Sequence, residues 1–159
     1  MTTSTQDYGV VRERVAGSGV EARPDSRIGA ALVALRLAAG AIFVAHGGQK
    51  LFVYGLEGVT ASFDGMGIPL AGLAAPAVAL IEAVGGLALI LGLFTRWVAV
   101  ALAAVMLGAL LLVHLPNGFF LPGGIEFVLV LLGVAGALAL TGAGEYSLDA
   151  LLGRRRAAR

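Results

Sequence analysis

Four long apolar segments alternate with shorter polar stretches along this chain. They cover the ranges Ile28–His46, Ala71–Phe94, Trp97–Leu115 and Gly124–Thr141. Each has about 18–24 residues, enough for a helix to cross about 30 Å of hydrocarbon at about 1.5 Å per residue. The runs are continuous rather than alternating and are rich in Ala and Leu, which favours helices over strands. The pattern predicts an all-α integral membrane protein built as a four-transmembrane-helix bundle.

The two ends of the chain are polar by contrast. Residues 1–27 have no apolar period, and we interpret them as a disordered N-terminal tail. No short apolar stretch with a small-residue cleavage site precedes the first apolar segment, so we expect no cleavable signal peptide. We place the transmembrane domain at residues 28–150 and a basic C-terminal tail at residues 151–159.

Basic residues predict the orientation of the helices. Nine arginines lie in the two tails or in the tight second connection, whereas Lys50 is the one basic residue of the other two connections. Because cytoplasmic loops carry an excess of Lys and Arg, both termini are predicted to be cytoplasmic, in the inner (plasma) membrane. The nine residues are Arg12, Arg14, Arg23, Arg27, Arg96, Arg154, Arg155, Arg156 and Arg159.

Composition agrees with the membrane assignment and excludes several kinds of chemistry. Apolar residues make up 58% of the chain and charged residues 13%, where soluble domains have about 45–50% and about 25%. The net charge of +1 gives no indication of a nucleic-acid partner. The chain contains no cysteine, which excludes disulfides, thiolate metal sites and a cysteine nucleophile.

The first outer connection, residues 47–70, is long for a link between packed helices, which usually takes about 2–8 residues. It mixes aromatic and aliphatic residues with glycines. That composition suits a segment that lies in the membrane interface and covers the outer mouth of the bundle. A flexible loop is the alternative.

Small residues are expected where helices pack within lipid, because they let the backbones approach closely. The candidates are Gly40, the Gly85–Gly86 pair, and the Ala104–Gly108 and Gly133–Ala137 spacings.

Three ionisable residues, Arg36, Glu82 and Glu126, lie within apolar segments. A charge at mid-helix costs about 2.5–3.5 kcal/mol on insertion scales, so it needs a partner or water. Counted from the cytoplasmic end of each segment, Arg36 lies about 12 Å up and Glu82 about 18 Å up, and an arginine stem spans that difference. We therefore predict an intramembrane Arg36–Glu82 ion pair, which either only locks two helices together or also serves function.

A second polar group is predicted near the outer surface. The same count places Glu126, His114 and His46 at about 21, 25 and 27 Å, and Lys50 lies one turn beyond His46. We predict that a ligand-binding pocket for a small polar or quinone-like molecule is formed there by His46, Gln49, Lys50, His114 and Glu126. The alternatives are separate rim residues that contact headgroups and water, or a metal site of two histidines and a carboxylate. The histidines lack a metal-binding spacing, so no metal is assigned.

Several short motifs follow one another in a particular order along the apolar segments. They are Arg36-Leu37, His46-Gly47, Gln49-Lys50-Leu51-Phe52, Met66-Gly67-Ile68-Pro69, Glu82-Ala83-Val84-Gly85-Gly86, His114, Glu126 and the run from Gly142 to Asp149. Their order and spacing resemble the DoxX family over about residues 30–150. The resemblance implies a four-helix inner-membrane protein. It also implies redox roles, since some members are a subunit of thiosulfate:quinone oxidoreductase or a membrane partner of superoxide dismutase and a sulfurtransferase in oxidative-stress defence.

Three kinds of function are compatible with these features. The first is a redox-linked membrane component, either a quinone-facing subunit or a membrane partner of oxidative-stress enzymes. The second is a small-solute or proton carrier, and the third is a non-catalytic membrane scaffold. Because the chain has no cysteine and no haem or flavin motif, a quinone or a partner redox protein would have to carry electrons. We expect contact with the lipid bilayer and with soluble or membrane redox proteins, not with nucleic acid, and leave open catalysis and a homo-oligomer.

Overall fold

The computed structural model describes residues 26–157, and every regular element within them is a helix. The all-α prediction is confirmed for this part of the chain. The predicted N-terminal tail, residues 1–27, lies outside the described residues except for its last two positions. The elements are α2 (Ser26–Gly48), η1 (Gln49–Val53), α3 (Gly55–Gly65), α4 (Ala71–Leu91), α5 (Thr95–Ala109), η2 (Leu110–His114), η3 (Leu115–Asn117), α6 (Glu126–Thr141) and α7 (Leu148–Ala157).

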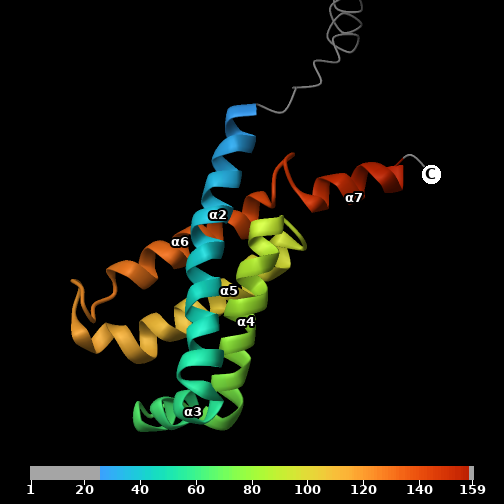
Figure 1. Cartoon of the computed structure of the whole chain (residues 1–159). Coiled ribbons are helices and arrows are strands. Elements are labelled where there is room, and N and C mark those ends of the chain that lie inside the picture. Colours follow the sequence, from blue (N-terminus) through green and yellow to red (C-terminus); the bar gives the residue numbers. More distant parts are fainter. Residues whose placement is uncertain (1–25, 158–159) are drawn as a thin grey trace, which may run out of the picture.

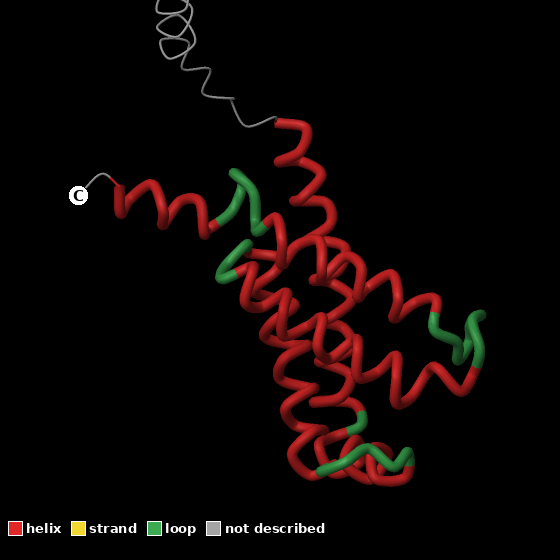
Figure 2. Tube along the Cα trace, turned by 180° about the vertical axis from the view of Figure 1, so that it is seen from behind, coloured by secondary structure: helices red, strands yellow, loops and turns green. Residues whose placement is uncertain are grey.

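The long helices form two antiparallel hairpins, α2 with α4 and α5 with α6 (Figure 1). The hairpins lie close together near the α4–α5 turn and diverge away from it, so that α3 and the η3 loop are far apart (Figure 2). We call the part of the molecule that contains η1 and α3 the α3 end. The part that contains α7 and the α4–α5 turn is the α7 end.

Within residues 26–157, three helical stretches are long and apolar enough to cross a membrane: Ser26–Val53, Ala71–Leu91 and Thr95–Asn117. The fourth apolar segment forms α6, which has 16 residues and therefore measures about 24 Å, less than the roughly 30 Å of a hydrocarbon core. The first two residues predicted for this segment, 124 and 125, precede the helix. By length alone, the structure supports three of the four predicted spans.

Glycines allow α2 and α4 to pack backbone to backbone. A Cβ atom on Gly86 would lie 2.7 Å from the backbone nitrogen of Val44 and 2.8 Å from the carbonyl oxygen of Gly40. A Cβ on Gly47 would lie 2.3 Å from the backbone nitrogen of Ala83. The prediction that Gly40 and Gly86 mediate packing is confirmed, and these close approaches fix one register between the two helices.

The other predicted packing positions are not used in this way. A Cβ on Gly108 or Gly133 would meet no other atom within 4 Å. Gly133 is exposed, and Gly108 lines the large cavity described below, so neither mediates a close helix contact and the prediction was wrong for these two spacings.

The first connection is not a flexible loop. The first long helix continues past His46 through η1 to Val53, and α3 then forms a separate helix at the α3 end. Phe63 and Met66 from this connection line the large cavity described below, so the segment forms part of its wall, whereas its place in the membrane interface stays a prediction. At the other end of the chain, most of the predicted basic tail belongs to α7, a helix that the apolar pattern did not reveal.

The α2–α4 contact gives the first test. We expect Gly86→Ala to lower the free energy of unfolding by about 1–3 kcal/mol, because the added methyl group forces two backbones apart. The control is Gly133→Ala on α6, where the methyl group enters open space and stability should stay the same or rise by up to about 1 kcal/mol, since Ala favours helix. Thermal melting in mild detergent measures both. Equal effects of the two variants would contradict the close α2–α4 packing.

Candidate functional site

A cavity of about 780 Å³ lies between the two hairpins, where they diverge. Most of its wall is apolar and comes from α2, α4, α5 and α6. The polar side chains on the wall are His46, Lys50, Glu82 and His114. We call this space the apolar cavity.

Lys50 and Glu82 form an ion pair on the cavity wall. Lys50 lies in η1, and its Nζ donates to Oε2 of Glu82 on α4. The glutamate is 4% exposed, and the lysine side chain is 18% exposed. A π-helical turn places Lys50, as the bond from the Tyr54 N–H to the Gln49 carbonyl (3.0 Å) shows. Such turns change the direction of side chains and are frequent at functional sites.

The predicted Arg36–Glu82 pair is wrong, because Glu82 pairs with Lys50 instead. The α2–α4 register explains the difference. Gly47 lies against Ala83, next to Glu82, whereas a Cβ on Gly92 would lie 2.0 Å from the guanidinium of Arg36. The level of Arg36 is thus ten residues, or about 15 Å, from Glu82 along α4. The height count failed because the first turns of α2 extend beyond the α4–α5 turn (Figure 1).

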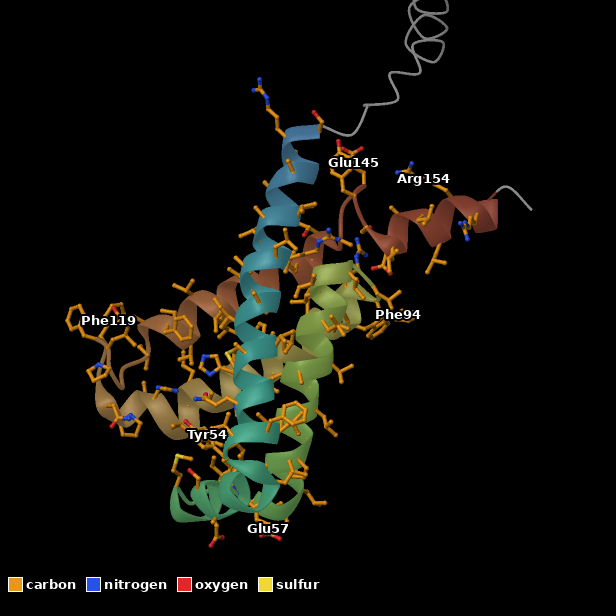
Figure 3. The ribbon with its side chains drawn as sticks, viewed as in Figure 1. Tyr54, Glu57, Phe94, Phe119, Glu145 and Arg154 are labelled. Carbon is orange, nitrogen blue, oxygen red and sulfur yellow. The ribbon has the colours of Figure 1, made fainter. Side chains whose placement is uncertain are left out.

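Arg36 belongs to a polar network at the α7 end. Its Nη2 donates to the backbone carbonyl of Tyr146 at 2.7 Å, and the residue is 2% exposed. The carboxylate of Asp149, at the start of α7, accepts from the backbone N–H groups of Phe94 (2.8 Å) and Thr95 (2.9 Å). It thereby caps α5 from a distant part of the chain. These bonds tie the segment after α6 to α2 and to the α4–α5 turn, on the side where Figure 3 labels Phe94 and Glu145.

The structure brings three predicted site residues, His46, Lys50 and His114, to the apolar cavity. The rings of His46 on α2 and Phe127 on α6 lie 6.2 Å apart, which links the two hairpins across the cavity. His114 ends η2, a second π-helical turn, and its Nδ1 is 2.8 Å from the carbonyl oxygen of Gly123. That contact holds the loop before α6 against the end of the preceding helix.

The other two predicted residues are placed differently. Gln49 lines a neighbouring, smaller cavity with His46 and Lys50. Glu126 is not on the wall of the apolar cavity, and its Oε1 accepts from the backbone N–H of Leu121 at 2.7 Å. The predicted five-residue pocket is therefore not one group, and Glu126 organises the loop before α6.

The sequence pattern did not predict that Glu82 pairs with Lys50 and lines the same cavity as His46. The signal was present, since a buried carboxylate needs a positively charged partner and Lys50 was available. The two π-helical turns could not be predicted, because no pattern of residues in the sequence indicates where i→i+5 hydrogen bonds form. Within residues 26–157 no group of three or more His, Asp or Glu side chains is arranged to hold a metal ion.

A double-mutant cycle tests the ion pair. We expect Glu82→Gln to lower the free energy of unfolding in detergent by about 1–3 kcal/mol, because Lys50 keeps its charge and loses its counter-charge. Combining Lys50→Met with Glu82→Leu should recover much of that loss. Arg36→Met with Glu82→Leu is the matched control and should be additive within about 0.5 kcal/mol, since these residues do not touch. Additive losses for Lys50 and Glu82 would contradict the pairing.

Comparison with known proteins places the chain in a family. The DoxX family profile matches residues 31–115, and a profile described as "TQO small subunit DoxD" matches residues 74–158. The chain is 38% identical over 115 residues to a Bacillus subtilis (strain 168) protein named "Putative oxidoreductase CatD", covering 72% of this chain and 81% of that one.

A second relative, from Mycobacterium tuberculosis (strain ATCC 25618 / H37Rv), is named "Uncharacterized membrane protein Rv3486". It is 34% identical over 142 residues, which cover 80% of this chain and 84% of the relative. No solved structure matches the chain. Together with the three apolar helices of membrane-spanning length, these matches show that the chain is a membrane protein of the DoxX family.

Proposed function

We propose that this DoxX-family protein is a redox-linked membrane component whose apolar cavity binds a quinone. The observation that carries the proposal is the Lys50–Glu82 ion pair on the wall of a large apolar space inside a membrane protein. Ionisable groups at membrane depth are costly and mark functional pathways more often than not. In this chain they lie beside a space that a ligand can enter.

The cavity has the size and chemistry for such a ligand. Its volume of about 780 Å³ lies within the roughly 300–1,000 Å³ of small-molecule sites. Phe43, Met106 and Leu131 supply apolar wall for a ring and an aliphatic tail. The Lys50 ammonium has three N–H donors and gives one to Glu82, which leaves donors for a carbonyl oxygen. His46, on the same wall, can donate or accept at the head group.

The proposed orientation follows from the basic residues. Arg96, Arg154 and Arg155 lie in or beside the α4–α5 turn and α7, so the α7 end would face the cytoplasm and both termini with it. In this arrangement α6, helped by local thinning of the bilayer, is the fourth transmembrane helix, because a short apolar helix can be accommodated in that way. The membrane would be the inner (plasma) membrane, with the α3 end outside.

Electron transfer requires a partner in this proposal. The chain has no cysteine to hold an iron–sulfur cluster or a redox-active disulfide. One relative's name includes oxidoreductase, and the second matching profile describes a small subunit. Both names favour a component that works with a separate membrane or soluble redox protein, which would supply or remove the electrons.

Mass spectrometry of the purified protein tests the binding. We expect protein isolated in mild detergent to contain a quinone at about one molecule per chain. In His46→Ala the quinone content should fall about tenfold, because the variant removes a polar group and a contact to Phe127 on the cavity wall. Melting temperatures should differ little.

The matched control is Glu126→Gln. Its side-chain oxygen can still accept the Leu121 N–H, and the residue is not on the cavity wall. Quinone content should therefore equal that of the unmodified protein. Absence of quinone, or equal loss in both variants, would sink the proposal and favour a carrier of small polar solutes or a scaffold.

A further inference from the structure

A second cavity, of about 650 Å³, lies next to the apolar cavity at the α3 end. Its wall comes from α2, η1, α3 and Tyr54 between the last two, with no residue from α4, α5 or α6. It shares His46, Lys50 and Phe63 with the apolar cavity. These three side chains are therefore a common wall that both spaces touch.

The second cavity is polar where the first is apolar. Gln49, Tyr54 and Ser62 line the second cavity and not the first. In the part of the chain that the structure describes, none of these three side chains makes a hydrogen bond. Tyr54 is 58% exposed and lies at the α3 end (Figure 3). A roomy space with several unpaired polar groups is where ordered water is expected.

Lys50 supports the same conclusion independently. Its ammonium has three N–H donors, of which Glu82 takes one. In the described part of the chain no other hydrogen bond of this side chain is formed. A partly buried ammonium with two free donors needs further acceptors, and water in the second cavity can supply them. Glu82 is thus shielded from water, whereas Lys50 is accessible from the second cavity.

We propose that the second cavity is a water-filled vestibule through which His46 and Lys50 exchange water and protons with the α3 side of the membrane. The apolar cavity receives its ligand from the bilayer, and the head group of that ligand meets the vestibule only across the shared wall. The two ring nitrogens of a histidine can take up and release protons, so His46 can pass protons across such a wall. The identity of the ligand rests on the proposed function, whereas the vestibule rests on the geometry of α2, η1 and α3.

Neither cavity is lined by a residue of the α7 end, which gives the exchange one direction. Arg36, Tyr146 and Asp149 are tied to α2 and the α4–α5 turn, and none of these residues lines either cavity. Protons gained or lost by a bound head group would therefore exchange with the solution on the side of the membrane that the α3 end faces. For a membrane component, this fixes the side on which protons appear or disappear.

Thiol labelling tests the vestibule, because a chain without cysteine offers no competing thiol. His46→Cys is placed in lipid nanodiscs, which leave both faces accessible, and is treated with a charged, membrane-impermeant methanethiosulfonate. We expect the thiol at position 46 to react. Adding Ser62→Trp, which fills the vestibule, should slow the reaction about tenfold, because only an accessible thiolate reacts.

Thr60→Trp is the matched control on the same helix, since Thr60 faces a different cavity, and it should leave the rate unchanged. Gly58→Phe, at a second vestibule position, repeats the block if Ser62→Trp folds poorly. No reaction at position 46, or a rate that neither blocking variant changes, would overturn the vestibule. Labelling of the thiol at position 46 as expected, together with no quinone in the unmodified protein, would support the vestibule and count against the proposed function alone.

Discussion

The ion pair between Lys50 and Glu82 is the interaction on which the arrangement of the α3 end depends. Glu82 is buried in an apolar helix pair, so it is tolerated only where a cation reaches it. That requirement fixes the level at which α2 and α4 meet, and the approach of Gly47 to Ala83 holds them there. It also explains why α2 does not end at His46. The helix must continue through the π-helical turn of η1 to bring Lys50 back over α4.

The two ends of the molecule are built for different tasks. At the α7 end, Asp149 caps α5 and Arg36 binds the Tyr146 carbonyl. These hydrogen bonds hold α2, the α4–α5 turn and the start of α7 together. Toward the other end the hairpins diverge, and there the cavities and the π-helical turns are found. Because the hairpins are joined at the α7 end and diverge from it, polar groups on both hairpins can face one ligand in the cavity between them. This arrangement follows the general rule that sites are precise when rigid elements carry them.

Much of the fold was predictable from the sequence because the bilayer demands long apolar helices. The predicted segment Ala71–Phe94 corresponds closely to α4, and the first segment contains most of α2. The helix register was not predictable. Counting heights from the end of each helix assumes that the helices begin at one level, and α2 begins beyond the α4–α5 turn. For that reason the sequence predicts an Arg36–Glu82 pair, whereas in the structure Gly92 lies against the Arg36 guanidinium. Glu126 was misplaced because its role depends on a loop fold, which no apolar period encodes.

Photo-crosslinking tests the proposal that a quinone lies in the apolar cavity beside Lys50 and Glu82. An azido-quinone would be activated on the full-length protein in nanodiscs and the modified peptides identified by mass spectrometry. We expect adducts on the cavity wall, at residues of α5 between Ala101 and Ala109 and at Phe127, and unlabelled quinone should compete with their formation. Adducts confined to exposed positions outside the cavity, such as Trp97 and Leu140, would contradict it, because those side chains are 80% and 82% exposed and face the surroundings.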